Sequence, residues 1–384
     1  MNSLHLAIVC EEFPPAPHGG TGSSYHDLAR GLVAKGHRVT VVAPSVTRPI
    51  PRRVDETEGL LTVHRLPRAW KVLGTRWGGI EERLRVKRVL REVTRRNAVS
   101  LVEASDYNGW LSMGALEGVP SVVKVRGSNV FFDAELGRQR QLFEAGHEIN
   151  ALRKASHIAS VSRYAAEKTM ELAGIADRPF QVVYNAVDTE FFSPGGMNEV
   201  EEGLVVFVNT VCQRKGIEPL MEAMNRVFAL NPNARLAVVG ACPGGDPYIE
   251  GLKAKVDQKF QSRVEFVGRL LRGETLQWLR KAAVCCYPSF METFGIAALE
   301  AMAVGRPTVF SKYGPGPELI EHGVTGLLCD PHSVDDLTGC LSQLLERRDV
   351  AEPMGAAARQ SVLARFDLPG WISRNETYYR SLLS

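Results

Sequence analysis

The feature that most constrains the fold is an alternation of short, β-branched apolar runs with amphipathic helical patterns. Residues 4–10 form one such run, and residues 38–43 form the next. Between them, Tyr25, Leu28 and Leu32 mark one face of a helix that Ser23 or Ser24 is predicted to cap and Gly36 to end. A β-loop-α-β unit of this kind opens a doubly wound parallel sheet, whose ligands bind at the carboxyl ends of the strands.

The pattern continues through the first half of the chain. Further strands are predicted at residues 60–65, 99–104, 121–126, 157–161 and 181–184. Helices are predicted between them, at residues 81–96, 107–118 and 164–173. Parallel strands joined by crossover helices follow from this order.

After a linker at residues 185–203 the alternation starts afresh. The second set of strands is predicted at residues 204–209, 235–239, 264–267, 283–287, 308–311 and 327–329. We therefore expect two α/β domains, residues 1–185 and 196–365, each Rossmann-like and doubly wound, with a cleft between them. Ser333 is predicted to cap a helix from residue 334. A last aromatic helix, residues 366–384, is expected to return to the first domain.

Composition narrows the function classes. The formal net charge of the 384 residues is only +3, which argues against a dedicated nucleic-acid binder. Neither a signal peptide nor an apolar run of the roughly 18 residues that span a bilayer is visible, so a cytoplasmic protein is expected. The seven cysteines include no C-x-x-C pair and are expected to be free thiols, mostly buried.

The segment at residues 288–307 shows two carboxylates around a predicted helix start. Glu292 lies in the loop before the helix and Glu300 lies within it, while Gly305 and Pro307 end the helix. The free N–H groups and partial positive charge of a helix N-terminus suit a phosphate group. Two solvated carboxylates without a ligand remain the alternative.

Two other loops carry groups that can bind an anion or approach a ligand. Arg214 and Lys215 follow the strand at 204–209 and precede a helix predicted at 217–229, a place that favours a diphosphate over a single charge. Gly19 and Gly20 let the backbone approach a ligand closely but lack the spacing of a dinucleotide site. Solvated cations and a tight turn without a ligand are the respective alternatives.

The strands of the first half end in polar residues. Asp106 and Tyr107 follow the fourth strand, and Arg126, Ser128 and Asn129 follow the fifth. A separate segment, residues 70–77, is aromatic and is followed by a run of arginines that could contact anionic lipid headgroups. A solvated crossover helix is the alternative there.

The chain resembles family 4 of the retaining glycosyltransferases, whose GT-B fold has two Rossmann-like domains facing across a cleft. Essentially the whole chain takes part, and the most specific part is Glu292-x7-Glu300 followed by Ala301-Met302-Ala303-x-Gly305-x-Pro307. Residues Gly314, Glu318, Gly323, Gly326 and Leu327 follow at the family's spacing.

The resemblance implies a nucleotide-diphospho-sugar donor, carrying UDP, GDP or ADP, and no metal or other cofactor. It implies that Lys215 and Arg214 bind the phosphates of the donor. Gly20 and the backbone amides of Phe294, Gly295 and Ile296 would also bind the donor. Glu300 would accept hydrogen bonds from the ribose, Glu292 would contact the donor sugar, and Gly268 and Arg269 would hold the base. Glu292 and Lys215 would be the catalytic pair.

The acceptor would be a glycan or a lipid-linked molecule held by the first domain. Its expected contacts are Gly19, Asp106, Tyr107, Arg126, Ser128 and Asn129. The family points to the synthesis of polysaccharides, glycolipids or other glycoconjugates in the cytoplasm, with peripheral contact at the inner membrane face as an open alternative.

Three positions depart from the family pattern. Thr210 stands where the family usually has an arginine, Arg126 where it often has a histidine, and Ala186 where it usually has a glycine. A guanidinium cannot act as a base but can bind a phosphate or an acidic acceptor. A non-catalytic partner protein and a GT-B epimerase or phosphorylase therefore remain alternatives to a transferase.

Overall fold

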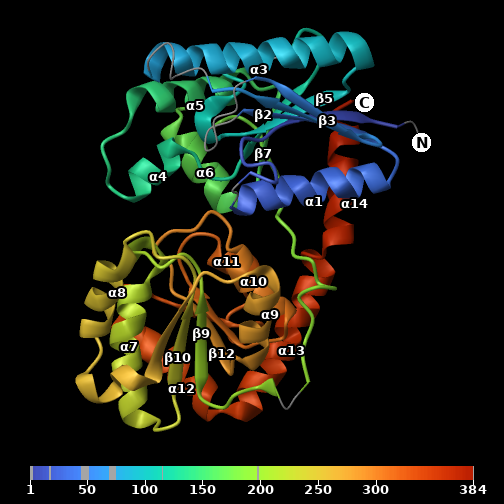
Figure 1. Cartoon of the computed structure of the whole chain (residues 1–384). Coiled ribbons are helices and arrows are strands. Elements are labelled where there is room, and N and C mark those ends of the chain that lie inside the picture. The colour runs from blue at the N-terminus through green and yellow to red at the C-terminus, as the bar shows by residue number, and fades with distance from the viewer. Residues whose placement is uncertain are drawn as a thin grey trace. The chain divides into compact units, whose positions relative to one another are not determined.

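The computed structural model describes residues 3–16, 19–44, 52–68, 75–114, 116–196 and 199–383. By its internal contacts the chain divides into two compact units. Unit 1 comprises residues 1–185 with 369–384, and unit 2 comprises residues 186–368. Both units are α/β sandwiches built on a sheet (Figure 1). The predicted fold class is confirmed by these two largely parallel sheets.

Among the described residues of unit 1, eight strands form one sheet in the order β3-β4-β2-β1-β5-β6-β7-β8. The strands are β1 (His5–Val9), β2 (Arg38–Pro44), β3 (Val54–Glu58), β4 (Leu61–Leu66), β5 (Leu101–Ser105), β6 (Ser121–Val125), β7 (His157–Ser160) and β8 (Gln181–Val182). All neighbouring pairs are parallel except β3–β4. Because the chain order reverses between β1 and β5, the loops after these two strands border a switch point, where doubly wound sheets bind ligands.

Helices cover both faces of this sheet (Figure 1). They are α1 (Gly20–Ala34), α3 (Thr75–Asn97), α4 (Asn129–Glu135), α5 (Leu142–Lys154), α6 (Arg163–Leu172) and α14 (Leu368–Ser381). Residues of α3, α5 and α6 share one apolar cluster with the alternate residues of β1, β5 and β6.

The last helix, α14, packs on unit 1 through a buried polar network. Tyr379 Oη donates to Glu103 Oε2 at 2.8 Å, and Lys124 Nζ donates to Asn375 Oδ1 at 3.2 Å. At the surface, Lys35 pairs with Glu376 at 2.9 Å. Residues at the end of the chain are thus joined to two central strands and to the end of α1.

The six described strands of unit 2 are all parallel, in the order β11-β10-β9-β12-β13-β14. They are β9 (Leu204–Val208), β10 (Arg235–Val239), β11 (Val264–Gly268), β12 (Val284–Tyr287), β13 (Thr308–Ser311) and β14 (Leu327–Cys329). The helices are α7 (Ile217–Leu230), α8 (Gly245–Ala254), α9 (Arg272–Lys281), α10 (Ile296–Ala303), α11 (Gly316–Leu319), α12 (Val334–Glu346) and α13 (Arg348–Arg365), with 3-10 turns η3 (Gln213–Lys215) and η4 (Gln258–Arg263). Here the order reverses between β9 and β12.

Several local predictions are confirmed. The side chain of Ser333 accepts a hydrogen bond from the N–H of Asp336 and so caps α12. Gly305, with φ +79°, follows the end of α10. All seven cysteines of the chain are unpaired, and five of them are buried.

Two predictions for unit 1 are wrong, and one strand was missed. Residues 107–118 do not form a helix but a 3-10 turn, η1 (Tyr107–Gly109), followed by further turns, because α5 packs against this segment. Neither Ser23 nor Ser24 caps α1, which begins earlier, at Gly20. The edge strand β3, with the exposed sequence VDETE, has no apolar alternation and was not predicted.

Candidate functional site

In unit 2 the loops after β9 and β12 meet at the switch point of the sheet. The two strands are neighbours, with Val205 paired to Val284 and Val206 to Cys285. The loop after β9 contains η3 with Arg214 and Lys215, and the loop after β12 contains Ser289 and Glu292. The fold therefore brings together residues that lie 77 positions apart in the sequence.

Lys215 and Glu292 form a largely buried ion pair. The Lys215 Nζ lies 2.5 Å from Glu292 Oε1, and the two side chains are only 9% and 12% exposed. Ser289 Oγ donates to the same carboxylate oxygen at 3.2 Å. A cation and a carboxylate are thus held in fixed positions at the carboxyl edge of the sheet.

Gly216 allows this close approach of the two loops. Its φ of +72° lies in the left-handed region, and a Cβ atom there would lie 1.7 Å from the carbonyl oxygen of Pro288. The N–H of Phe290 donates to the carbonyl of Arg214 at 3.0 Å, which joins the loops by a second contact.

The N-terminus of α10 lies in the continuation of the β12 loop. Gly295, at φ +110°, precedes Ile296 as the N-cap residue, and a Cβ on Gly295 would lie 2.7 Å from the ring of Phe310. Phe294 is buried, with its ring 6.1 Å from that of Phe366. The first amides of a helix have no partner within it, so those at Gly295 and Ile296 are suited to an anion.

Glu300 lies in the second turn of α10. Burial raises the pKa of its carboxyl group to about 7, while the guanidinium of Arg272 opposes this shift. No hydrogen bond or ion pair of the Glu300 side chain is found within the part of the chain that the structure describes. A carboxylate in this state is suited to accept hydrogen bonds from ligand hydroxyls.

The remaining expected donor residues of unit 2 lie further along the edge. Gly268, at φ +83°, ends β11, and its carbonyl accepts the N–H of Gly240 at 2.8 Å. Arg269 follows it and is exposed. Since β10 separates β11 from β9, these residues lie two strands away from Lys215. Thr210 is partly exposed in the β9 loop, and its N–H donates to Asn209 Oδ1.

In unit 1, Asp106 and Arg126 follow β5 and β6 and lie together at the carboxyl edge. Asp106 Oδ1 accepts the backbone N–H of Arg126 at 2.9 Å, and burial raises the pKa of Asp106 to about 6. The Arg126 side chain is 7% exposed, donates from Nη1 to Asn185 Oδ1 at 3.0 Å, and stacks on the ring of Tyr25 at 4.4 Å. Its Nε and Nη2 atoms are buried without a hydrogen-bond partner.

Glu148 in α5 organises the neighbouring loops and was not found from the sequence. Its carboxylate accepts four hydrogen bonds, from the backbone N–H groups of Asn108, Asn129 and Val130 and from the Asn129 side chain, at 2.8–3.1 Å. The side chain is fully buried. A carboxylate in the middle of an amphipathic helix gives no pattern by which these partners could be predicted.

The other expected acceptor residues are placed as follows. The Ser128 hydroxyl caps α4 by accepting from the N–H of Phe131 at 3.2 Å, and the Asn129 amide is bound to Glu148. Tyr107 is 37% exposed at the same edge. Gly19 donates its N–H to Glu12 Oε2 at 3.0 Å, and Gly20 begins α1.

A second acid, Glu11, was also missed by the sequence analysis. It follows β1, accepts from Asn108 Nδ2 at 3.0 Å and from Trp110 Nε1, and has a pKa raised by burial to about 7. The carboxyl ends of β1, β5 and β6 thus share a cluster of buried acids and one incompletely paired guanidinium. Among the described residues, no group of three or more His, Cys, Asp or Glu is placed to hold a metal ion.

Two family models match the chain. The model described as "Glycosyltransferase Family 4" covers residues 18–191, and "Glycosyl transferases group 1" covers residues 189–361. Together they cover most of the sequence, so the chain belongs to the family 4 glycosyltransferases.

The matches to individual relatives cover different shares of the two chains. The chain is 27% identical to a glycogen synthase of Mycobacterium tuberculosis, over 95% of this chain and 91% of the relative. It is 31% identical to a D-inositol 3-phosphate glycosyltransferase of Kribbella flavida, over 50% of this chain and 49% of the relative.

Solved structures show the same fold. A sucrose-phosphate synthase from Thermosynechococcus elongatus matches 99% of both chains with a TM-score of 0.82 and 22% identity. The Anabaena protein HepE in complex with UDP and glucose matches 98% of this chain and 100% of its own, with a TM-score of 0.75 and 18% identity. The chain therefore has the GT-B fold that was expected.

Proposed function

We propose that the protein is a retaining glycosyltransferase that moves a sugar from a nucleotide diphosphate to an acceptor hydroxyl. The observation that supports this most directly is the buried Lys215–Glu292 pair beside the N-terminus of α10. A structural neighbour that holds UDP and glucose agrees with a donor of this class. The intact pair favours an enzyme over a non-catalytic partner protein.

In this proposal unit 2 binds the donor. Lys215, with Arg214, and the amides of Gly295 and Ile296 stabilise the diphosphate as negative charge develops on it, which needs no metal ion. Glu300 accepts hydrogen bonds from the ribose, and Glu292 lies at the donor sugar. The bond between the anomeric carbon and the diphosphate oxygen breaks as the acceptor oxygen bonds to the same face of the sugar. The leaving phosphate takes the acceptor proton.

Unit 1 binds the acceptor in this proposal, through the edge that carries Asp106, Tyr107 and Arg126. Membrane contact and a cytoplasmic location stay predictions. Of the aromatic segment 70–77, residues 70–74 lie outside the described residues. In α3, Trp77 is 73% exposed, and the exposed residues Leu84, Arg88 and Arg91 follow it along the helix. No helix in the described ranges is both long and apolar enough to cross a bilayer.

Binding of the donor nucleotide should depend on the ionisation of Glu300. One of UDP, GDP and ADP is expected to raise the melting temperature of the protein. Burial raises the pKa of Glu300 in the free protein to about 7, and a bound ribose favours the carboxylate. Affinity should therefore fall as the pH drops below 7, by up to about tenfold per unit, since protons compete with the ribose hydroxyls.

Calorimetric titrations at several pH values measure this effect. The nucleotide phosphate itself titrates, so the Glu300→Gln variant serves as the control: it should bind more weakly and retain only the pH dependence of the nucleotide. Identical pH profiles for the two proteins would contradict the role of Glu300. Failure of all three nucleotides to bind would contradict the proposed function.

Arg126 is expected to contact an anionic group of the acceptor or donor. Its two unpartnered nitrogens lie at the carboxyl edge of the unit 1 sheet. Loss of a charge-assisted hydrogen bond costs about 1.5–3 kcal/mol, so Arg126→Gln should raise the KM for one substrate about 10- to 100-fold. Arg163→Gln, which removes an exposed guanidinium at the start of α6, is the control. Steady-state kinetics with unchanged KM for both substrates would remove this role.

A further inference from the structure

A polar cavity lies in unit 1 at the edge opposite to the candidate acceptor site. It has a volume of about 320 Å³ and lies between the C-terminal end of α3 and the strands β2, β4 and β3. Arg38, at the start of β2, lies on its rim, whereas Arg126 and Asp106 follow the carboxyl ends of parallel strands. The cavity is therefore separate from the site described above.

The floor of the cavity is a row of three threonines. Thr40, Thr62 and Thr57 are register partners on β2, β4 and β3. A sheet face beneath a helix is normally apolar. Further along the same strands this face is apolar, since Val42 and Leu66 belong to the hydrophobic core. The polar part of the face lies where the apolar stripe of α3 ends, at Val93.

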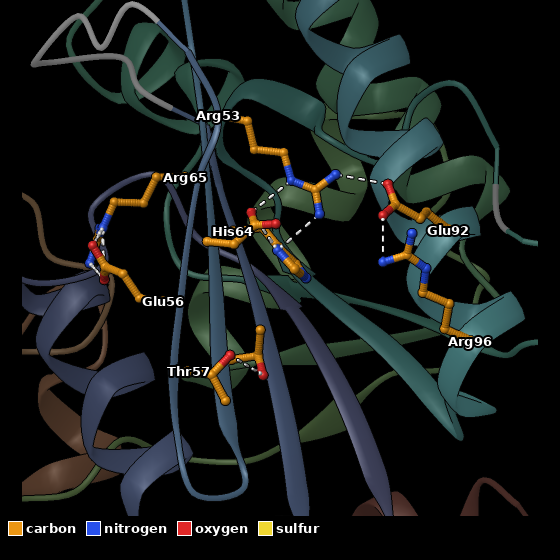
Figure 2. A network of polar contacts seen from close by, with 9 residues as sticks. Arg53, Glu56, Thr57, His64, Arg65, Glu92 and Arg96 are labelled. Carbon is orange, nitrogen blue, oxygen red and sulfur yellow. Dashed lines mark hydrogen bonds and ion pairs between the residues drawn. The ribbon is translucent and has the colours of Figure 1, made fainter.

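A buried histidine lies beside the threonines. His64 is 9% exposed, and its Nδ1 atom lies 2.9 Å from Asp55 Oδ1 and 3.1 Å from Arg53 Nη2. Figure 2 shows Arg53 between this histidine and Glu92 of α3, which fixes the ring from one side. Within the described residues the Nε2 atom of His64 has no hydrogen-bond partner, and His64 lines the cavity.

The charges around the cavity favour an anion. The carboxylate of Glu92 is bound by both Arg53 and Arg96, and Asp55 is bound by Arg53. Arg38, in contrast, donates only to the neutral amide of Asn97, at 3.0 Å, and forms no ion pair in the described parts of the chain. Three guanidiniums face two carboxylates, which leaves one positive charge.

We propose that this cavity binds a phosphorylated monosaccharide. The guanidiniums of Arg38 and Arg96 match the geometry of a phosphate, because each can donate two parallel hydrogen bonds. The hydroxyls of Thr57 and Thr62, which lie 3.3 Å from each other, and the free nitrogen of His64 can donate or accept a hydrogen bond, as sugar hydroxyls do, whereas the Thr40 hydroxyl is bound to His5. A mainly polar cavity at the lower end of the usual ligand-pocket size suits one small, hydroxylated anion.

Calorimetry with the full-length protein tests the proposal. The probes are glucose 1-phosphate, glucose 6-phosphate and fructose 6-phosphate, with glucose and inorganic phosphate as fragments. At least one hexose phosphate should bind about tenfold more tightly than either fragment. The double variant Arg38→Ala/Arg96→Ala should weaken it by at least about tenfold. Thr62→Val should weaken the hexose phosphate but not inorganic phosphate.

The matched control is Arg88→Ala/Arg91→Ala, which removes the same charge from exposed positions of α3 that do not line the cavity. It should leave the affinity within about twofold of wild type. The proposal is overturned if no hexose phosphate binds at about 10 mM, if inorganic phosphate binds equally well, or if both double variants lose the same affinity. Saturating donor nucleotide should not compete with the hexose phosphate, because the proposed site of the nucleotide lies in unit 2, whereas the cavity lies in unit 1.

Discussion

Replacing Lys215 by alanine is expected to lower the rate of sugar transfer by about 100- to 1,000-fold, the usual cost of losing a group that stabilises charge in the transition state. The Lys215 ammonium is held in place by Glu292 at 2.5 Å and lies beside the N-terminus of α10. In the proposed reaction it faces the negative charge that develops on the diphosphate. Its loss should therefore reduce kcat more than it raises KM for the donor.

Glu292→Gln should give a loss of similar size, since it removes the partner that fixes Lys215 and the carboxylate at the donor sugar. Lys259→Ala is the control, because Lys259 is exposed in the same unit. The measurement is single-turnover transfer from a labelled nucleotide sugar, with the melting temperature recorded for each variant. Near-normal turnover in both the Lys215 and the Glu292 variants, with the fold intact, would contradict the proposed function.

Replacing Glu148 by alanine should lower the free energy of unfolding by about 4 kcal/mol, because three backbone N–H groups would lose their only described acceptor inside unit 1. Each unsatisfied buried donor costs about 1–3 kcal/mol. Glu148→Gln should cost roughly half as much, since its amide oxygen can still accept while its NH₂ group faces donors.

Urea unfolding followed by circular dichroism measures this effect. Glu144, one turn earlier in α5, makes no hydrogen bond or ion pair among the described residues and lies in the first turn of the helix, so Glu144→Ala is the matched control and should change the stability by less than about 1 kcal/mol. Equal stabilities of the Glu144 and Glu148 variants would show that Glu148 does not hold these loops.

The two candidate sites differ in how far the sequence could predict them. In unit 2, Lys215, Glu292 and Gly295 follow strands with clear apolar patterns and stand at loop or helix boundaries. Local rules therefore suffice to expect an anion site there. The resemblance to the family then suggested a donor role for each residue.

In unit 1 the local rules were misleading. Residues 107–118 have a helical pattern, but Glu148 of α5 binds the N–H of Asn108, and Gly109, at φ +56°, packs directly against the backbone of His147. A contact with a distant helix thus overrides the local preference. Glu11 gave no signal either, because its partners Asn108 and Trp110 lie about a hundred residues away.

The sequence by itself determined that strands and helices alternate in two series and that Glu292, Glu300 and Lys215 stand at loop and helix positions suited to a phosphate. These are properties of side-chain periodicity and of turn residues within a few positions of one another. The order of the strands was decided only by the tertiary structure. Hydrogen bonding places β9 beside β12, and so brings Lys215 to 2.5 Å from Glu292, because strand pairing is a contact between segments that no local pattern encodes.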